Sequence, residues 1–323
     1  MDVRKLLNSR LILVTGKGGT GKTTVSAALG RLLSDRGERT IVAEVDTFRP
    51  ALTPMLGKKP VYKPSAVAPN LHVCNISWRD ALVEWLRGHV PGQRVVRRIL
   101  DNNLVQTFLD ATPGLRETVI LSRVVTLLET YDRVVVDMPA SGHAISLLGV
   151  PNVAIGLMRG GPIRERAEVV LRHLSAPTTA LVIVGLPEEM VVNETVELWE
   201  RLQKEVPTLR RPLVVLNRAA LPSLSQDERT LLERLESQSA QTLSPVQQEL
   251  IRAGRWEATL EQGTADSLIR LDDELGVEVI PVARLGALGG FEGGPARIVQ
   301  QVASTLARAE LAAAQPAHGS AGR

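Results

Sequence analysis

Short aliphatic segments recur along the chain, and helical patterns of apolar residues separate them. Several are apolar at every position, which is typical of strands that helices cover on both faces. Because parallel strands need long crossover connections, we predict an α/β fold with a doubly wound, mostly parallel sheet of about seven or more strands. The predicted strands are Leu11–Thr15, Thr40–Val45, Leu71–Ile76, Arg133–Met138, Thr179–Val184, Leu213–Leu216 and Val277–Val282.

The interval from Trp78 to about Tyr131 lacks a strand pattern. Apolar residues at helical spacing predict an α-helical insertion at residues 78–131, on the rim of the sheet domain. Trp78, Leu82 and Trp85 fall on one face of its first helix. The later apolar positions Val96, Ile99, Leu100, Val105, Phe108 and Leu109 are broken by Arg94, Arg97, Arg98 and Asp101.

The remaining pattern predicts one domain over residues 1–312. A second helical stretch runs from Ser225 to about Asp273, and Pro245 and Gly254 are expected to interrupt it. The last helix, Pro295 to Ala312, has apolar residues on one face, few basic residues and no aromatic one, so we expect it to pack on the core. Residues 313–323 are small and polar enough for a disordered tail.

Composition adds modest limits to this picture. The 323 residues are 44% hydrophobic and carry a formal charge of +3, a weak indication of an anionic partner. The single cysteine, Cys74, excludes an internal disulfide or a CxxC site and is expected to be buried. The longest uncharged apolar stretch, Ala144 to Met158, falls short of the roughly 20 residues that span a bilayer. We therefore expect a cytoplasmic protein without an integral membrane segment.

The segment Gly16–Thr23 reads GKGGTGKT and matches the phosphate-binding pattern GxxxxGK[ST]. It lies between a predicted strand and a predicted helix, where backbone N–H groups and the helix dipole attract phosphate. This predicts ATP binding, with Lys22 at the β- and γ-phosphates and the Thr23 hydroxyl on Mg. The nucleotide-contacting positions would be Gly18, Gly19, Thr20, Gly21, Lys22, Thr23 and Thr24.

Lys17 directly follows the first glycine of this loop and supplies one more cation than the pattern needs. Here the chain resembles the deviant-Walker ATPases, whose loop reads KGGxGK[ST]. In that family this lysine crosses a dimer interface to the nucleotide of the partner, so the resemblance implies an ATP-coupled dimer. The alternative is a solvent-facing lysine in a monomeric nucleotide kinase.

Asp137 ends the predicted strand RVVVD, where a carboxylate would lie near magnesium and its waters. The following residues, Met138–His143, resemble the D-T-A-P-T-G-H switch segment of the ArsA and tail-anchored-protein-targeting ATPases. Gly142 and His143 coincide with that pattern, whereas one proline is displaced. The resemblance implies a loop that senses the γ-phosphate. By itself, His143 would be read as an ordinary capping or surface histidine.

Asp46 follows the second strand at the position where this family places its first switch aspartate, which holds the attacking water. The family continues Pro-Ala-His, whereas this chain continues Thr47-Phe48-Arg49. Glu44, two residues earlier, would project from the same side of the strand but deeper in the sheet. We prefer Asp46 as the water-positioning base and keep Glu44 as the alternative.

Three further segments carry the resemblance. Pro113–Glu117 looks like the P-G-x-x-E element that closes the helical subdomain, and Asn217 ends a strand where the family has an adenine-reading asparagine. Pro281 and Val282 resemble its second adenine contact. The chain therefore resembles the ArsA/tail-anchored-targeting (Get) ATPase family from about Arg10 to Val282. It lacks the NKxD sequence of guanine-specific relatives, which favours ATP over GTP.

Family members differ in cargo. A cysteine trio for metalloids and a dimer-bridging CxxC are both missing here. The resemblance implies a homodimer, or a heterodimer with a paralogous ATPase, that hydrolyses ATP slowly to act on a partner such as a hydrophobic protein client. The helices at 78–109 would form the client groove, unless their apolar face is buried in their own domain.

Two other functions remain open. One is a ParA- or MinD-like positioning ATPase, although the chain has neither a basic amphipathic terminal helix for membranes nor a strong basic patch for nucleic acid. The other is a regulatory subunit that binds nucleotide without turnover.

Overall fold

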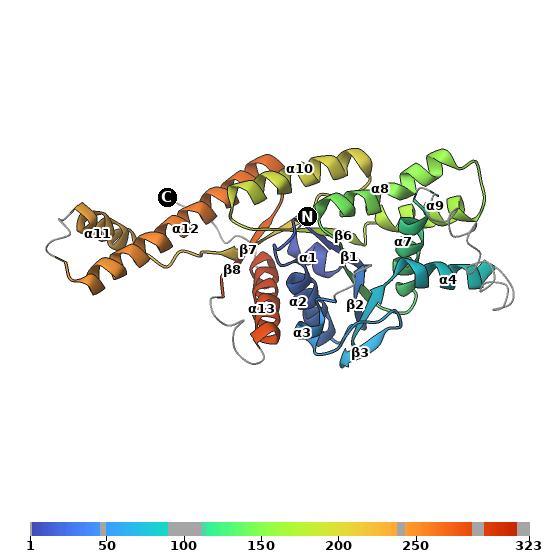
Figure 1. The fold of residues 1–323 in the computed structure, drawn as a ribbon, viewed down its shortest axis with the longest axis horizontal. Coiled ribbons are helices and arrows are strands. Elements are labelled where there is room, and N and C mark those ends of the chain that lie inside the picture. The colour runs from blue at the N-terminus through green and yellow to red at the C-terminus, as the bar shows by residue number, and fades with distance from the viewer. Residues whose placement is uncertain are drawn as a thin grey trace.

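The computed structural model describes residues 2–45, 50–89, 112, 114–237, 243–285 and 294–314. A central sheet is covered by helices on both faces, and helical extensions project at the two ends of the long axis (Figure 1). One extension contains α4 (Trp78–His89) and the other contains α11 (Gln226–Ser237) with part of α12 (Pro245–Leu275). The molecule is therefore elongated.

The sheet has eight strands in the order β3-β4-β2-β5-β1-β6-β7-β8. Every neighbouring pair is parallel except β3 with β4, so the predicted doubly wound α/β fold is confirmed. All seven predicted strands are present, and the additional one, β3, is a short antiparallel edge strand. The strands are β1 Leu11–Thr15, β2 Thr40–Val45, β3 Ser65–Ala68, β4 Leu71–Ile76, β5 Arg133–Asp137, β6 Thr179–Gly185, β7 Leu213–Ala219 and β8 Val279–Ala283.

The two faces of the sheet support two separate core clusters. Along β1, Leu11 and Leu13 belong to one cluster, whereas Ile12 and Val14 belong to the other. This alternation follows from the two-residue period of a strand, and both faces are apolar because both are covered. On one face lie α1 (Val3–Leu7), α2 (Lys22–Asp35), α3 (Thr53–Leu56) and α13 (Gly294–Ala314); on the other lie α7 (Leu115–Leu127), α8 (Ser141–Leu157), α9 (Pro162–Leu174) and α10 (Glu189–Glu205).

The bounds of β5, β6, β8 and α13 differ from the sequence prediction by one or two residues, and β7 and α12 differ more. The strand predicted to end at Leu216 continues to Ala219 after a register shift, with Arg218 in a left-handed conformation at φ +55°. Gly254 does not interrupt α12, which runs unbroken from Pro245 to Leu275. A Cβ on Gly254 would lie 3.0 Å from a methyl carbon of Leu232, so this glycine allows α11 to pack closely.

Other predictions agree with the structure where it can be compared. Pro245 occupies the first turn of α12, behind a capping box of Ser244 and Gln247, so it starts the helix. Cys74 is fully buried, and α13 buries Val299 and Leu306 in the core. Residues 90–111 of the predicted insertion lie outside the described residues, as does the predicted tail beyond the end of α13 at Ala314.

No described helix is both long and apolar enough to cross a membrane.

Candidate functional site

The loop between β1 and α2 has a backbone that requires glycine. Gly16, Gly19 and Gly21 have φ values of +141°, +84° and +96°. A Cβ on Gly16 would lie 2.2 Å from the Val184 carbonyl oxygen, so the loop also approaches β6 too closely for a side chain. Gly18 and Gly19 face open space, because a Cβ on either would have no neighbouring atom within 4 Å. The loop thus turns tightly on one side and stays accessible on the other, as a phosphate cradle requires.

Lys22, Thr23 and Thr24 form the first turn of α2, where unpaired N–H groups and the helix dipole favour an anion. The Lys22 ammonium donates to the Lys17 carbonyl oxygen at 2.9 Å, and the Thr20 hydroxyl donates to the same oxygen at 2.9 Å. Burial lowers the pKa of Lys22, while nearby Asp137 opposes that shift. A polyanion beside Lys22 would favour its charged form.

Asp137 lies at the carboxyl end of β5, next to β1 in the sheet. Its two oxygens accept hydrogen bonds from the Thr23 hydroxyl at 2.6 Å and the Ser26 hydroxyl at 3.2 Å. Burial raises the pKa of Asp137 to about 6, against the effect of both hydroxyls and Lys22. A hydroxyl and a carboxylate are the hard oxygen donors that Mg²⁺ takes together with phosphate oxygens. The donor set therefore fits magnesium at Thr23.

Ser26 was missed in the sequence, although it lies one helical turn after Thr23 and hence on the same face.

The segment after Asp137 is hydrogen-bonded to the end of β1 and to the start of the phosphate loop. The Ser141 N–H donates to the Gly16 carbonyl oxygen at 3.2 Å, and the Thr15 hydroxyl donates to the Pro139 carbonyl oxygen at 3.3 Å. Helix α8 begins at Ser141, and Gly142 and His143 are exposed in its first turn. The predicted switch segment thus lies against the loop that would hold the phosphates.

Glu44 is a buried carboxylate beside Asp137, because the two residues are register partners on β2 and β5. One oxygen accepts the backbone N–H groups of Ala51 at 2.6 Å and Leu52 at 3.1 Å, and the other has no hydrogen-bond partner. Burial raises its pKa to about 7, and the Asp137 charge adds to that effect. Glu44 therefore holds the backbone at Ala51 and Leu52, shortly after residues 46–49 in the sequence. Asp46 itself lies outside the described residues.

Lys17 makes an ion pair that the sequence did not reveal. Its ammonium lies 2.7 Å from a carboxylate oxygen of Glu194, on α10. Both side chains are about one third exposed, so solvent and a partner molecule can reach the pair. No local pattern links residues so distant in the chain, and the contact depends on where α10 packs.

Asn217 contacts the phosphate loop rather than standing free beside it. Its amide nitrogen donates to the Thr20 carbonyl oxygen at 2.8 Å, and its amide oxygen accepts the Arg218 N–H at 2.9 Å. A Cβ on Gly21 would lie 2.3 Å from that nitrogen. An amide has spare donor and acceptor capacity for a base. Pro281 is half-buried and Val282 is in the core, so the Val282 side chain is not available to a nucleotide.

The described residues include no cluster of three or more His, Cys, Asp or Glu side chains suited to a metal ion. A Mg²⁺ ion that shares its coordination with phosphates and water needs no such cluster.

Comparisons with known proteins show which family the chain resembles in sequence. A family model described as an anion-transporting ATPase matches residues 9–172, just over half of the chain. The ATPase BagA of Mycobacterium tuberculosis is 33% identical over 222 residues, which cover 63% of this chain and 64% of that protein. A putative arsenical pump-driving ATPase of Prosthecochloris vibrioformis is 26% identical over 200 residues, covering 60% and 49%.

An ATPase ASNA1 homolog of Entamoeba dispar is 29% identical over 153 residues, covering 44% of this chain and 46% of that protein. The chain therefore spans less than two thirds of the length of these relatives. The matched region contains the phosphate loop, Glu44 and Asp137, but the family model ends before Glu194 and Asn217. With a mostly parallel α/β sheet, a glycine loop between β1 and α2, and a family model over half its length, this chain belongs to the anion-transporting ATPase (ArsA) family.

Proposed function

We propose that this protein hydrolyses ATP to ADP and phosphate in a magnesium-dependent reaction. The observation that carries the proposal is the Thr23–Asp137 hydrogen bond of 2.6 Å at the base of an open glycine loop. The loop N–H groups and Lys22 bind and orient the β- and γ-phosphates, and Thr23 holds the metal. Magnesium, when bound, neutralises charge that develops on the phosphate oxygens.

We assign the orientation of the attacking water to Asp46. Its place between β2 and the anchored residues Ala51 and Leu52 supports this role, because Glu44 fixes the returning end of the segment. Glu44 is better suited to holding the backbone than to contacting water, since one of its oxygens already accepts two N–H groups. Catalysis then depends on positioning and charge stabilisation.

We further propose that two chains, identical or paralogous, meet across their nucleotides and form a switch. In the single chain Lys17 is paired with Glu194, which holds its ammonium beside α10. In the dimer Lys17 would leave Glu194 and contact the phosphates bound to the partner. Loss of the γ-phosphate would release the segment at Asp46 and the segment after Asp137. Helix α8 would transmit the change, because it begins at Ser141 in the segment after Asp137.

The output of the switch would be work on a partner, for which we propose a protein client. The apolar face of α4 packs on its own core, through Leu82, Trp78 and Trp85, so α4 alone does not form a client groove. Buried Cys74 offers no exposed thiolate to a soft metalloid, and burial raises its pKa to about 12. A protein client is therefore favoured over arsenite as cargo.

The test is to measure phosphate release and molecular mass with and without ADP–aluminium fluoride, for wild type, Lys17→Ala and Asp46→Asn. Exposed Lys59→Ala is a matched control. We expect magnesium-dependent turnover, an analogue-induced dimer, and loss of both in Lys17→Ala. Asp46→Asn should retain the ATP dimer without turnover.

An active monomer that is indifferent to Lys17 would exclude the dimeric mechanism. Nucleotide binding without any turnover in wild type would identify a regulatory subunit instead. Partners that co-purify with Asp46→Asn identify the cargo: hydrophobic proteins support targeting, and DNA supports a positioning ATPase.

A further inference from the structure

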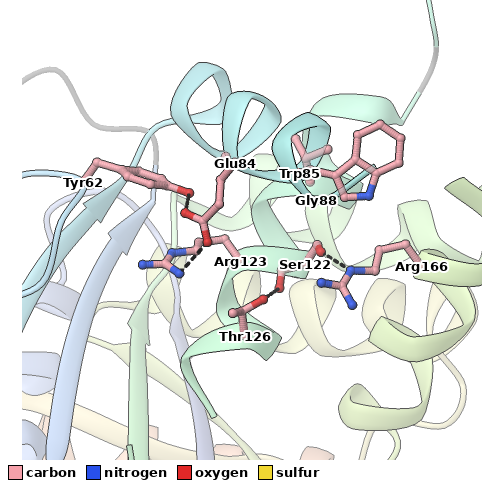
Figure 2. Close-up of a pocket in the computed structure, with 10 residues that line it drawn as sticks. Tyr62, Glu84, Trp85, Gly88, Ser122, Arg123, Thr126 and Arg166 are labelled. Atoms are coloured by element: carbon pink, nitrogen blue, oxygen red, sulfur yellow. Dashed lines mark hydrogen bonds and ion pairs between the residues drawn. The ribbon is translucent and has the colours of Figure 1, made fainter. Parts of the chain in front are cut away.

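A small pocket lies away from the phosphate loop, between α4, α7 and α9. Figure 2 shows Glu84, Trp85 and Gly88 from α4, Ser122, Arg123 and Thr126 from α7, Arg166 from α9, and Tyr62 from the segment before β3. The cavity has a volume of about 170 Å³, and Ala81 and Val119 complete its apolar wall. A cavity of roughly 150 Å³ holds a molecule the size of benzene.

The first cationic group that lines the pocket is Arg123. One terminal nitrogen of Arg123 lies 2.8 Å from Glu84, and the same carboxylate accepts the Tyr62 hydroxyl at 2.6 Å (Figure 2). The guanidinium carbon also lies 5.2 Å from the centroid of the Tyr62 ring, a cation–π contact. Its Nε is buried and has no hydrogen-bond partner. Since this nitrogen is not exposed, Arg123 would contribute its positive charge to the pocket rather than a hydrogen bond from Nε.

The second cationic group, Arg166, is less constrained. Its Nε donates to the Ser122 hydroxyl, and no ion pair of Arg166 with a carboxylate occurs among the described residues (Figure 2). Both of its terminal amino groups therefore remain available. With Arg123 and Glu84, the ionisable side chains among the described residues that line the pocket carry one net positive charge. A guanidinium whose planar fork is free matches a carboxylate, which it binds through two parallel hydrogen bonds.

We propose that this pocket binds a small organic carboxylate with one negative charge and a compact apolar body. The carboxylate would lie against Arg166 and Ser122, and the apolar body would lie between Trp85, Val119 and Ala81. The volume limits the ligand to roughly seven to nine non-hydrogen atoms. The single net charge of the lining favours a monoanion over a phosphate dianion. The site uses none of the residues that bind nucleotide.

The test is isothermal titration calorimetry of the nucleotide-free full chain with 3-methylbutanoate and with benzoate. The neutral amides of both acids are the ligand controls. We expect saturable one-to-one binding of at least one acid, at least tenfold weaker binding of its amide, and at least tenfold weaker binding to Arg166→Gln. The matched protein control is Arg172→Gln, an exposed arginine on the same helix that does not line the pocket.

Binding to Arg172→Gln should stay within twofold of wild type. Circular dichroism establishes that Arg166→Gln is folded, and Ser122→Ala gives a second variant with a smaller expected loss of about threefold. The site is excluded if neither acid saturates, if the amides bind equally well, or if folded Arg166→Gln binds like wild type. None of these outcomes depends on ATP hydrolysis, so the pocket and the proposed ATPase activity can fail separately.

Discussion

The phosphate loop and the pocket between α4, α7 and α9 are built from different parts of the protein chain. The loop relies on main-chain geometry, with three glycines at positive φ and the first turn of α2. The pocket relies on side chains, chiefly Arg123 and Arg166, which come from two helices and contact different partners. A main-chain site requires particular residues at fixed spacing, so it can be recognised in the sequence as a motif. A side-chain site can be assembled from any helices that pack together, so it has no such motif.

The largest effect should come from Lys22→Ala. Because the role we propose for Lys22 is to supply a partly buried positive charge at the phosphates, we expect turnover to fall by about 100-fold or more, as when one preorganised electrostatic group is removed. Phosphate release at saturating ATP measures this. Lys58→Ala, on the partly exposed segment after α3, serves as control. Carboxylate binding in the helical pocket should not change, and a parallel loss there would break the distinction between the two sites.

The next effect concerns stability rather than turnover. Since burial raises the pKa of Glu44 to about 7 from an ordinary 4.5, the folded state binds its proton more tightly than the unfolded state. The stabilisation of the folded state by protonated Glu44 is present in full below about pH 4.5 and is lost as pH rises through 7. The free energy of unfolding of wild type should fall by about 3 kcal/mol relative to Glu44→Gln across this window.

Urea unfolding of the metal-free protein at several pH values measures the difference between wild type and Glu44→Gln. Asp137, with its pKa raised to about 6, shifts stability in the same direction in both proteins, so the difference reports Glu44 together with its interaction with the Asp137 charge. Parallel pH profiles would show that Glu44 is not protonated in the folded state near neutral pH.

A smaller effect is expected for Glu194→Gln. The change releases Lys17 from a partly exposed ion pair, and such pairs contribute roughly 0.2–1 kcal/mol. Analogue-induced dimerisation should therefore strengthen by about two- to fivefold, measured by sedimentation. Glu197→Gln, one turn further along α10 and exposed, is the control. Weaker dimerisation in Glu194→Gln would show that the ion pair supports the dimer instead of competing with it.

The smallest effect belongs to the helical pocket. Glu84→Gln removes the only carboxylate among the described residues that line it, and the net charge of the lining rises from one to two. Binding of 3-methylbutanoate should tighten by about threefold, as expected for a half-exposed charge in high dielectric. Exposed Glu165→Gln on α9 serves as control. Weaker binding would indicate that Glu84 acts mainly by positioning Arg123.

Much of the fold was predictable because its signals are local. The strands Leu11–Thr15, Thr40–Val45 and Leu71–Ile76 were predicted with the bounds that the structure shows. A strand buried on both faces is apolar throughout, so its length can be read directly. β3 was missed because a short edge strand of small residues has no such pattern, and Gly254 was misread because its close contact with α11 is tertiary.

The sequence by itself determined the phosphate loop, the strand-end carboxylate Asp137 and the predicted magnesium ligand Thr23, since each depends on backbone geometry within a strand–loop–helix unit. Only the tertiary structure decided that Glu194 pairs with Lys17, that Glu44 anchors the segment after Asp46, and that Arg123 and Arg166 converge on one cavity. The physical reason is that these contacts depend on how helices and loops pack against the sheet, and packing leaves no periodic trace in the residues that make it.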